Sequence, residues 1–288
     1  MPEGPGRFAR RSPFPAPLDK ESMDQAVAPG AELADRLIAA LRQDEFVLYA
    51  QPIAHLGPDE GQRAFQEILV RFQEEEAKLL PPGSFLPILD EFGLMPYVDR
   101  WVVNRVAKWV HTLQAINPDR PAPRNSINLS AETLSDAKFA EYTIRHLQGA
   151  GLPKGTLSFE VTCDSAAPRV KPLIDLMAQL RPAGCGFTLA RFDGGERAFA
   201  LLRLLAPEFV KLSPGLVRSL DQGRAGMERI EAIVRECRAG ATATIAEHVE
   251  SNHTIARLRE AGVDFGQGFG IHAPHPLDRA TGTQWRIA

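Results

Sequence analysis

The chain has 288 residues, of which 44% are hydrophobic and 24% charged, and its formal net charge is −3. This composition fits a globular protein, gives no reason to expect binding to DNA or a membrane surface, and contains no apolar run near the roughly 20 residues of a membrane helix. The N-terminal residues hold no apolar signal core and the three cysteines show no CxxC spacing, so we expect a cytoplasmic protein with reduced thiols.

The first segment differs from the rest of the chain. Residues 1–29 are rich in proline, glycine and charge and have no hydrophobic period, which predicts a flexible leader or an interdomain linker. Residues 30–288 are expected to form one folded domain. It begins with a helical pattern at 31–43, followed by two strands that are close enough in sequence to pair antiparallel, at 46–54 and 63–72.

The remaining elements alternate regularly. Six further strands are expected, each followed by a helical or turn segment, at 124–130, 156–162, 186–190, 208–213, 241–247 and 263–269. Strands separated by helices of about 10–15 residues predict right-handed crossovers and a parallel sheet. About eight strands with this spacing favour a closed barrel over an open sheet. The predicted fold is therefore α/β, a modified TIM (β/α)8 barrel with one antiparallel strand.

Polar side chains gather at the predicted carboxyl ends of the strands, where parallel barrels place their functional groups. Reading those ends in order gives Glu67, Asn128, Glu160, Ala190 with Arg191, Lys211 with Ser213, Glu247 and Gln267, all of which except Ala190 are polar. Oxygen ligands of this kind suit Mg²⁺ or Mn²⁺, and two such ions would serve phosphodiester hydrolysis. The alternative for any single carboxylate is that it caps the helix that follows its strand.

The motifs that carry these residues follow one another in a characteristic order. "LYAQPI" (48–53), "EILVR" (67–71), "INLS" (127–130), "FEVT" (159–162), "FVKLS" (209–213), "AEHVE" (246–250) and "DFGQGF" (264–269) together resemble the EAL domains of bacterial cyclic-di-GMP signalling. The resemblance spans roughly residues 31–280. It implies a barrel with one antiparallel strand that binds a cyclic dinucleotide across its mouth. Active members hydrolyse one phosphodiester bond with two divalent metals.

This sequence departs from the family pattern at the metal-holding positions. The motif D-D-F-G-T-G is replaced by Ala190-Arg191-Phe192-Asp193-Gly194-Gly195, and K-I-D is replaced by Lys211-Leu212-Ser213. Glu67, Asn128 and Glu160 would then be vestigial metal ligands, and Lys211 and Glu247 vestigial catalytic residues. Asp193 is expected to be a turn residue. We therefore expect no hydrolysis of cyclic-di-GMP and no cofactor.

The resemblance also implies a set of ligand contacts. Arg71 stands at the phosphate-contacting arginine of the family, and its fork geometry suits a bidentate grip. Asp99 stands where a carboxylate accepts from guanine, although a surface pair with Arg100 or Lys108 is an equal alternative for it. For Arg71 the alternative is a salt bridge to residues 74–76. The full expected ligand set is Gln51, Glu67, Leu69, Arg71, Asp99, Asn128, Glu160, Arg191, Glu250 and Gln267.

Three functions remain open from the sequence. The first is a metal-independent cyclic-di-GMP receptor that reports to a protein partner or to an N-terminal signalling domain. The second is a protein-interaction module that binds neither nucleotide nor metal, which the altered turn at 190–195 favours. The third is a weak residual phosphodiesterase that would need Mg²⁺ or Mn²⁺. Homodimers are common in the family, but the altered turn puts the usual interface in doubt.

Overall fold

The computed structural model describes residues 31–43, 45–57, 63–73, 79–80, 82–220 and 223–277. Its strands are β1 (Phe46–Pro52), β2 (Ala54–His55), β3 (Phe65–Gln73), β4 (Leu79–Leu80), β5 (Arg124–Asn128), β6 (Leu157–Thr162), β7 (Gly186–Phe192), β8 (Phe209–Leu212), β9 (Ala243–Ala246), β10 (Phe265–Gly266) and β11 (His275–Pro276). The expected leader at 1–29 lies outside the described residues.

The α-helices alternate with the strands from β3 onward. They are α2 (Ala31–Arg42), α3 (Leu86–Glu91), α4 (Met95–Ile116), α5 (Phe139–Gly149), α6 (Cys163–Ala166), α7 (Val170–Leu180), α8 (Glu196–Leu205), α9 (Pro214–Ser219), α10 (Arg224–Ala239) and α11 (Asn252–Glu260). Short 3₁₀ turns lie at Pro82–Ser84, Thr133–Ser135 and Ala167–Arg169. None of the helices in the described ranges is long and apolar enough to cross a membrane.

The strands form one curled sheet in the order β11-β1-β3-β5-β6-β7-β8-β9-β10-β2, with β4 beside β3. Pairing is parallel from β3 through β5, β6, β7, β8 and β9 to β10. Strand β1 is antiparallel to β3, with Gln51 opposite Glu67. After Ile53 the same stretch of chain continues as β2, which pairs antiparallel with β10. The sheet is therefore a TIM-like barrel with one antiparallel strand, as the sequence predicts.

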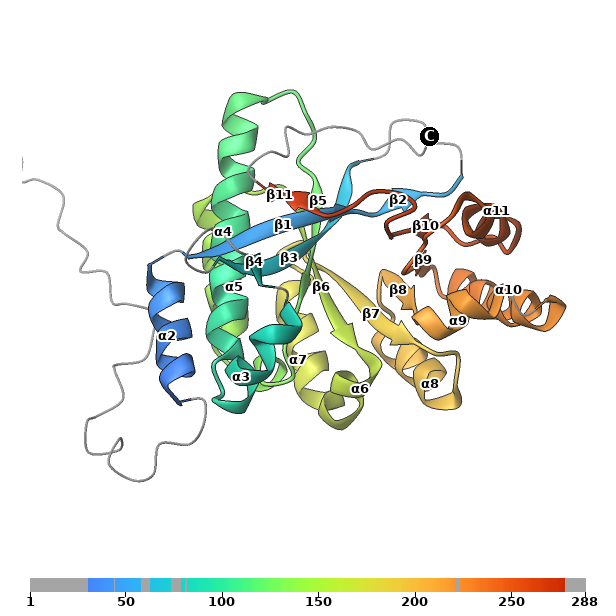
Figure 1. Ribbon diagram of the computed structural model, residues 1–288, viewed down its shortest axis with the longest axis horizontal. Coiled ribbons are helices and arrows are strands. Elements are labelled where there is room, and N and C mark those ends of the chain that lie inside the picture. Colours follow the sequence, from blue (N-terminus) through green and yellow to red (C-terminus); the bar gives the residue numbers. More distant parts are fainter. Residues whose placement is uncertain are drawn as a thin grey trace, which may run out of the picture.

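The helices cover the outer face of the sheet (Figure 1). Their apolar residues recur every three or four positions and so form one buried stripe per helix, which in α4 is Val98, Trp101, Val102, Val106 and Val110. Helix α2 packs beside α3 at the edge of this layer (Figure 1). The three cysteines are buried and free. Sequestering these stripes between helices and sheet forms the main core.

A second, smaller core fills the inside of the barrel near the amino ends of the strands. It consists of Ile53, Phe65, Phe209 and Ile245, with Phe265 packed against them. The rings of Phe65 and Phe209 lie 5.0 Å apart. Because alternate residues of a strand face the same side, the residues two positions further along these strands also point inward. This alternation carries polar side chains toward the mouth.

Candidate ligand-binding site at the barrel mouth

Lys211 lies at the centre of the polar cluster inside the barrel. Its Nζ atom is 2.7 Å from Oε2 of Glu67, 2.8 Å from Oε2 of Glu160 and 3.5 Å from Oε1 of Glu247. The Lys211 side chain is completely buried. These four residues come from β3, β6, β8 and the end of β9, so the barrel brings together groups that are far apart in sequence. A buried ammonium is tolerated here because carboxylates surround it.

Amide and hydroxyl groups complete the hydrogen bonds of the two central carboxylates. Asn128 Nδ2 donates to Oε1 of Glu67 at 2.7 Å, and Gln267 Nε2 donates to Oε2 of Glu67 at 2.7 Å and to Oε1 of Gln51 at 3.1 Å. Ser126 Oγ donates to Oε2 of Glu160 at 3.2 Å. Every oxygen of Glu67 therefore has a donor from the protein itself.

The two buried carboxylates of the cluster have pKa values shifted in opposite directions. Burial raises the pKa of Glu67, but the charge and hydrogen bond of Lys211 and the bonds from Asn128 and Gln267 outweigh it and leave the pKa below its ordinary value. Burial raises the pKa of Glu160 to about 7. The charge of Lys211 opposes this rise, and the charges of Glu67 and Glu247 add to it. Burial would lower the pKa of Lys211, yet its three carboxylate neighbours raise it. Lys211 therefore stays charged and Glu67 is its ionised partner.

The β1–β3 pair extends beyond the parallel part of the sheet. Strand β3 pairs with β5 only through residues 65–68, whereas it pairs with β1 as far as Phe72. Leu69 and Arg71 continue the face that carries Glu67. The Arg71 guanidinium lies 5.7 Å from the centre of the Tyr49 ring and donates to the carbonyl of Val70 at 2.9 Å. The sequence predicts Glu67 at the end of its strand, but the strand continues beyond it. Glu67 lies instead where the parallel part of the sheet ends.

Asp99 occupies a different environment from the other expected site residues. Only 3% of it is exposed, and its Oδ2 accepts from the backbone N–H of Ser130 at 2.9 Å, just after β5. Burial raises its pKa to about 6, partly opposed by hydrogen bonds from Thr133 and Ser130. The surface pair with Arg100 or Lys108 is therefore wrong. Arg100 instead forms an ion pair with Asp136.

The end of β7 carries Ala190 and Arg191. Ala190 is buried, whereas Arg191 is exposed and has a backbone φ of 53°. Left-handed backbone is uncommon for residues other than glycine, asparagine and aspartate. The pairing between β7 and β8 is irregular between Leu189 and Phe192, which places Arg191 at a bulge.

The turn after β7 is fixed by local bonds and by α10. Asp193 Oδ1 accepts from the N–H of Gly195 at 2.9 Å, and Arg229 of α10 donates to the Asp193 carbonyl at 2.8 Å. Asp193 is therefore a turn residue, as expected.

Residues 34–274 match the EAL domain model. This chain belongs to the EAL domain family. It is 31% identical over 259 residues to the cyclic di-GMP phosphodiesterase PdeB of Shewanella oneidensis, a match that covers 90% of this chain and 30% of that protein. It is 30% identical over 248 residues to the cyclic di-GMP phosphodiesterase PdeF of Escherichia coli, covering 85% of this chain and 32% of that protein. The chain thus spans about a third of the length of these curated relatives.

Solved EAL domains share the fold. The EAL domain of FimX from Xanthomonas citri, in complex with c-diGMP, superposes with a TM-score of 0.81 at 22% identity, covering 93% of this chain and 100% of that one. The FimX EAL domain from Pseudomonas aeruginosa, bound to c-di-GMP, gives a TM-score of 0.79 at 24% identity, covering 90% of this chain and 100% of that one.

The EAL barrel brings most of the expected site residues together, and it adds others that sequence reasoning missed. Gln51, Glu67, Asn128, Glu160, Lys211, Glu247 and Gln267 form one connected cluster. Glu250 is exposed beyond β9, and no bond links it to this cluster within the described ranges. Ser126 and Tyr49 were missed. Ser126 stands two residues before Asn128, so the two-residue period of a strand could have identified it.

Proposed function

We propose that this EAL domain binds cyclic-di-GMP at the barrel mouth without a divalent metal and does not hydrolyse it. The observation that carries the proposal is the presence of Ala190, Arg191 and Ser213 where the family pattern has carboxylates. In addition, Lys211 Nζ lies within hydrogen-bond distance of both Glu67 and Glu160. This ammonium offsets one negative charge from within the protein, and the pKa of Glu160, raised to about 7, allows that carboxyl to hold a proton near neutral pH. The mouth therefore depends less on a bound cation to cancel the charge of Glu67 and Glu160.

The residues present do not fit the metal pair of active members. In the described ranges, no group of three or more histidine, cysteine, aspartate or glutamate side chains is arranged to hold a metal ion. Ala190 offers no ligand oxygen, Ser213 only a hydroxyl, and Arg191 a positive charge. A unit positive charge about 4 Å from a divalent cation costs roughly 8 kcal/mol at an effective dielectric near 20.

The charges at the mouth suit a dianionic ligand. Lys211 is paired with three carboxylates, of which Glu67 and Glu160 are buried. Arg71 and Arg191 add two positive charges at the rim, one on the extension of β3 and one at the β7 bulge. A guanidinium binds a phosphate group through two parallel N–H···O bonds. Two arginines therefore match the two phosphates of a cyclic dinucleotide, with Leu69 as an apolar surface for a base.

Isothermal titration of cyclic-di-GMP in the presence of EDTA tests the receptor. We expect saturable binding of micromolar affinity or tighter, weakened at least about tenfold in Arg71→Ala and in Arg191→Ala, because each loses a charge-assisted hydrogen bond. Arg235→Gln, at an exposed position of α10, is the matched control and should bind like the wild type. Absence of heat would favour the protein-interaction module instead.

A hydrolysis assay with Mg²⁺ or Mn²⁺ tests the second half of the proposal. The wild-type chain is expected to leave cyclic-di-GMP intact. The triple substitution Ala190→Asp, Arg191→Asp and Ser213→Asp restores the carboxylates of the family pattern, and any turnover should appear there first. Linear product from the wild type at the rate of an active EAL domain would establish the phosphodiesterase alternative.

A further inference from the structure

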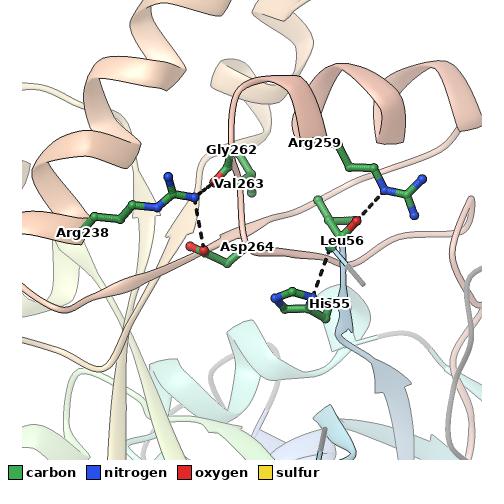
Figure 2. Close-up of a pocket in the computed structure, with 8 residues that line it drawn as sticks. His55, Leu56, Arg238, Arg259, Gly262, Val263 and Asp264 are labelled. Atoms are coloured by element: carbon green, nitrogen blue, oxygen red, sulfur yellow. Dashed lines mark hydrogen bonds and ion pairs between the residues drawn. The ribbon is translucent and has the colours of Figure 1, made fainter. Parts of the chain in front are cut away.

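A second cavity lies at the opposite end of the barrel from Lys211. It has a volume of about 520 Å³ and is lined by His55 to Gly57 after β2, by Arg238 in the last turn of α10, and by Arg259 and residues 262–264 between α11 and β10 (Figure 2). Asp264 directly precedes β10, so the cavity opens at the amino ends of the strands. The ligand site proposed above uses the carboxyl ends, and the two share no residue.

Two arginines give this cavity a fixed positive charge. Arg238 Nη2 donates to the carbonyl of Gly262 at 2.6 Å, and Arg259 Nε donates to the carbonyl of Leu56 at 2.5 Å (Figure 2). Both bonds reach across to another segment of the chain and hold the guanidinium groups in place. An arginine has five N–H donors, so each group keeps donors for a further partner.

The one carboxylate in the lining is already engaged. Asp264 Oδ2 accepts from the backbone N–H and the hydroxyl of Thr244, both at 2.8 Å, and its Oδ1 lies 3.7 Å from Arg238. It therefore offsets only part of the charge of the two guanidinium groups. The balance of charge in the cavity favours an anion.

His55 adds a neutral donor beside the arginines. The N–H of Gly57 donates to its Nδ1 at 3.1 Å, which leaves the hydrogen of the neutral imidazole on Nε2. The ring packs edge-on against Phe265 at 5.1 Å. A Cβ atom on Gly57 would lie 2.9 Å from the imidazole, and one on Gly262 3.2 Å from the Arg238 guanidinium, at a φ of +78°. The two glycines therefore let these side chains lie close to the backbone.

We propose that this cavity binds the phosphate groups of a small soluble molecule, with Arg238 contacting them from one side and Arg259 from the other (Figure 2), and with His55 Nε2–H as an additional donor. Arginine forks match the geometry of phosphate oxygens, and fixed donors lose less conformational entropy on binding than mobile ones do. The recess and its volume are in the range of small-molecule sites. The cavity is independent of the cyclic-di-GMP site, so either can exist without the other.

Titration calorimetry on the full chain with inorganic phosphate, pyrophosphate and GMP tests this site. We expect saturable binding of at least one of these probes, at least about tenfold weaker in Arg259→Gln and lost in Arg238→Gln/Arg259→Gln. Arg235→Gln, on the same helix as Arg238 but outside the cavity, should bind like the wild type. Binding should also persist in Arg71→Ala, which impairs only the mouth. No saturable binding of any probe, or binding unchanged in the double variant, would overturn the proposal.

Two milder variants keep the test valid if the double variant unfolds. Arg259→Lys keeps the charge but loses the fork, and His55→Phe keeps the ring packing but loses the Nε2–H donor. Each should weaken binding of the same probe several-fold while thermal unfolding without ligand stays near that of the wild type. If neither changes the affinity, the phosphate site is not in this cavity.

Discussion

Two neighbouring layers inside the barrel use the same strands in opposite ways. The lower layer contains Phe65, Phe209 and Phe265, and the layer two residues further along holds Glu67, Lys211 and Gln267. The lower layer packs apolar side chains, and it stabilises the fold by removing them from water. The upper layer buries charges, whose desolvation cost is offset only by pairing within the cluster. The lower layer therefore stabilises the barrel, and the upper layer places paired polar groups at its mouth.

The largest expected effect in the upper layer follows from removing its cation. Lys211→Met leaves Glu67 and Glu160 buried without their counter-ion, which should lower the free energy of unfolding by about 3–5 kcal/mol at neutral pH. Urea denaturation followed by circular dichroism measures it. Adding Glu67→Gln and Glu160→Gln to the same chain should recover part of the loss. A variant as stable as the wild type would show that the carboxylates are not charged in the folded state.

In the lower layer the expected loss comes from a cavity. Phe209→Ala removes a ring that contacts Phe65 and Phe265 and over which the Arg124 guanidinium lies at 4.8 Å. The free energy of unfolding should fall by about 3–4 kcal/mol. Cyclic-di-GMP affinity, measured by calorimetry at a temperature where the variant is folded, should stay unchanged. A loss of cyclic-di-GMP affinity in Phe209→Ala would show that the lower layer also contributes to ligand binding.

The buried carboxyl of Asp99 should make the stability of the fold depend on pH. Because burial raises its folded pKa from 3.8 to about 6, the folded state holds a proton that the unfolded state has lost between these values. This contribution to stability is present at pH 4, is lost as the pH rises to about 6, and amounts to the order of 2–3 kcal/mol. Asp99→Asn should remove it. Between pH 4 and pH 7 the free energy of unfolding should therefore fall less in the variant than in the wild type. If it falls equally in both, the pKa of Asp99 is not raised in the folded state.

The smallest expected effect concerns the Ser126 hydroxyl, which donates to Glu160. Ser126→Ala removes the donor to Oε2 of Glu160 and should cost about 1 kcal/mol in the free energy of unfolding. Ser158→Ala is the control, because its hydroxyl lies 3.4 Å from the neutral Thr188 hydroxyl and not beside a carboxylate. The control should cost less. Equal losses in both variants would mean that the carboxylate does not use this bond.

Periodicity predicted much of the architecture because each signal is local. The alternation of strands and helices gave the barrel, and the short separation of residues 46–54 from 63–72 gave the antiparallel pair. Two short strands were not expected, β4 and β11. Strand β11 has only two residues, which pair with Tyr49 and Ala50 more than 220 positions away. A two-residue strand has no period of its own, so local patterns cannot reveal it.

The site was predicted less completely than the fold. Positions at strand ends identified Lys211 and its carboxylate neighbours, but not which atoms pair. Asp99 was assigned to a guanine contact or a surface pair, and its actual partner, the N–H of Ser130, comes from a loop 31 residues away. The cavity lined by His55, Arg238 and Arg259 was not anticipated, because these residues belong to no common motif. The resemblance to EAL domains concerned the opposite end of the barrel.

The sequence by itself determined the order of elements, the family motifs and the presence of Ala190, Arg191 and Ser213 within them, because these are properties of neighbouring residues. Only the tertiary structure decided that Lys211 lies between Glu67 and Glu160, that Glu160 has a raised pKa, and that Arg238, Arg259 and His55 line one cavity at the other end of the barrel. These features depend on closing the barrel. Closure brings distant side chains within bonding distance and removes water from around them, and both the pairing and the pKa changes follow from that.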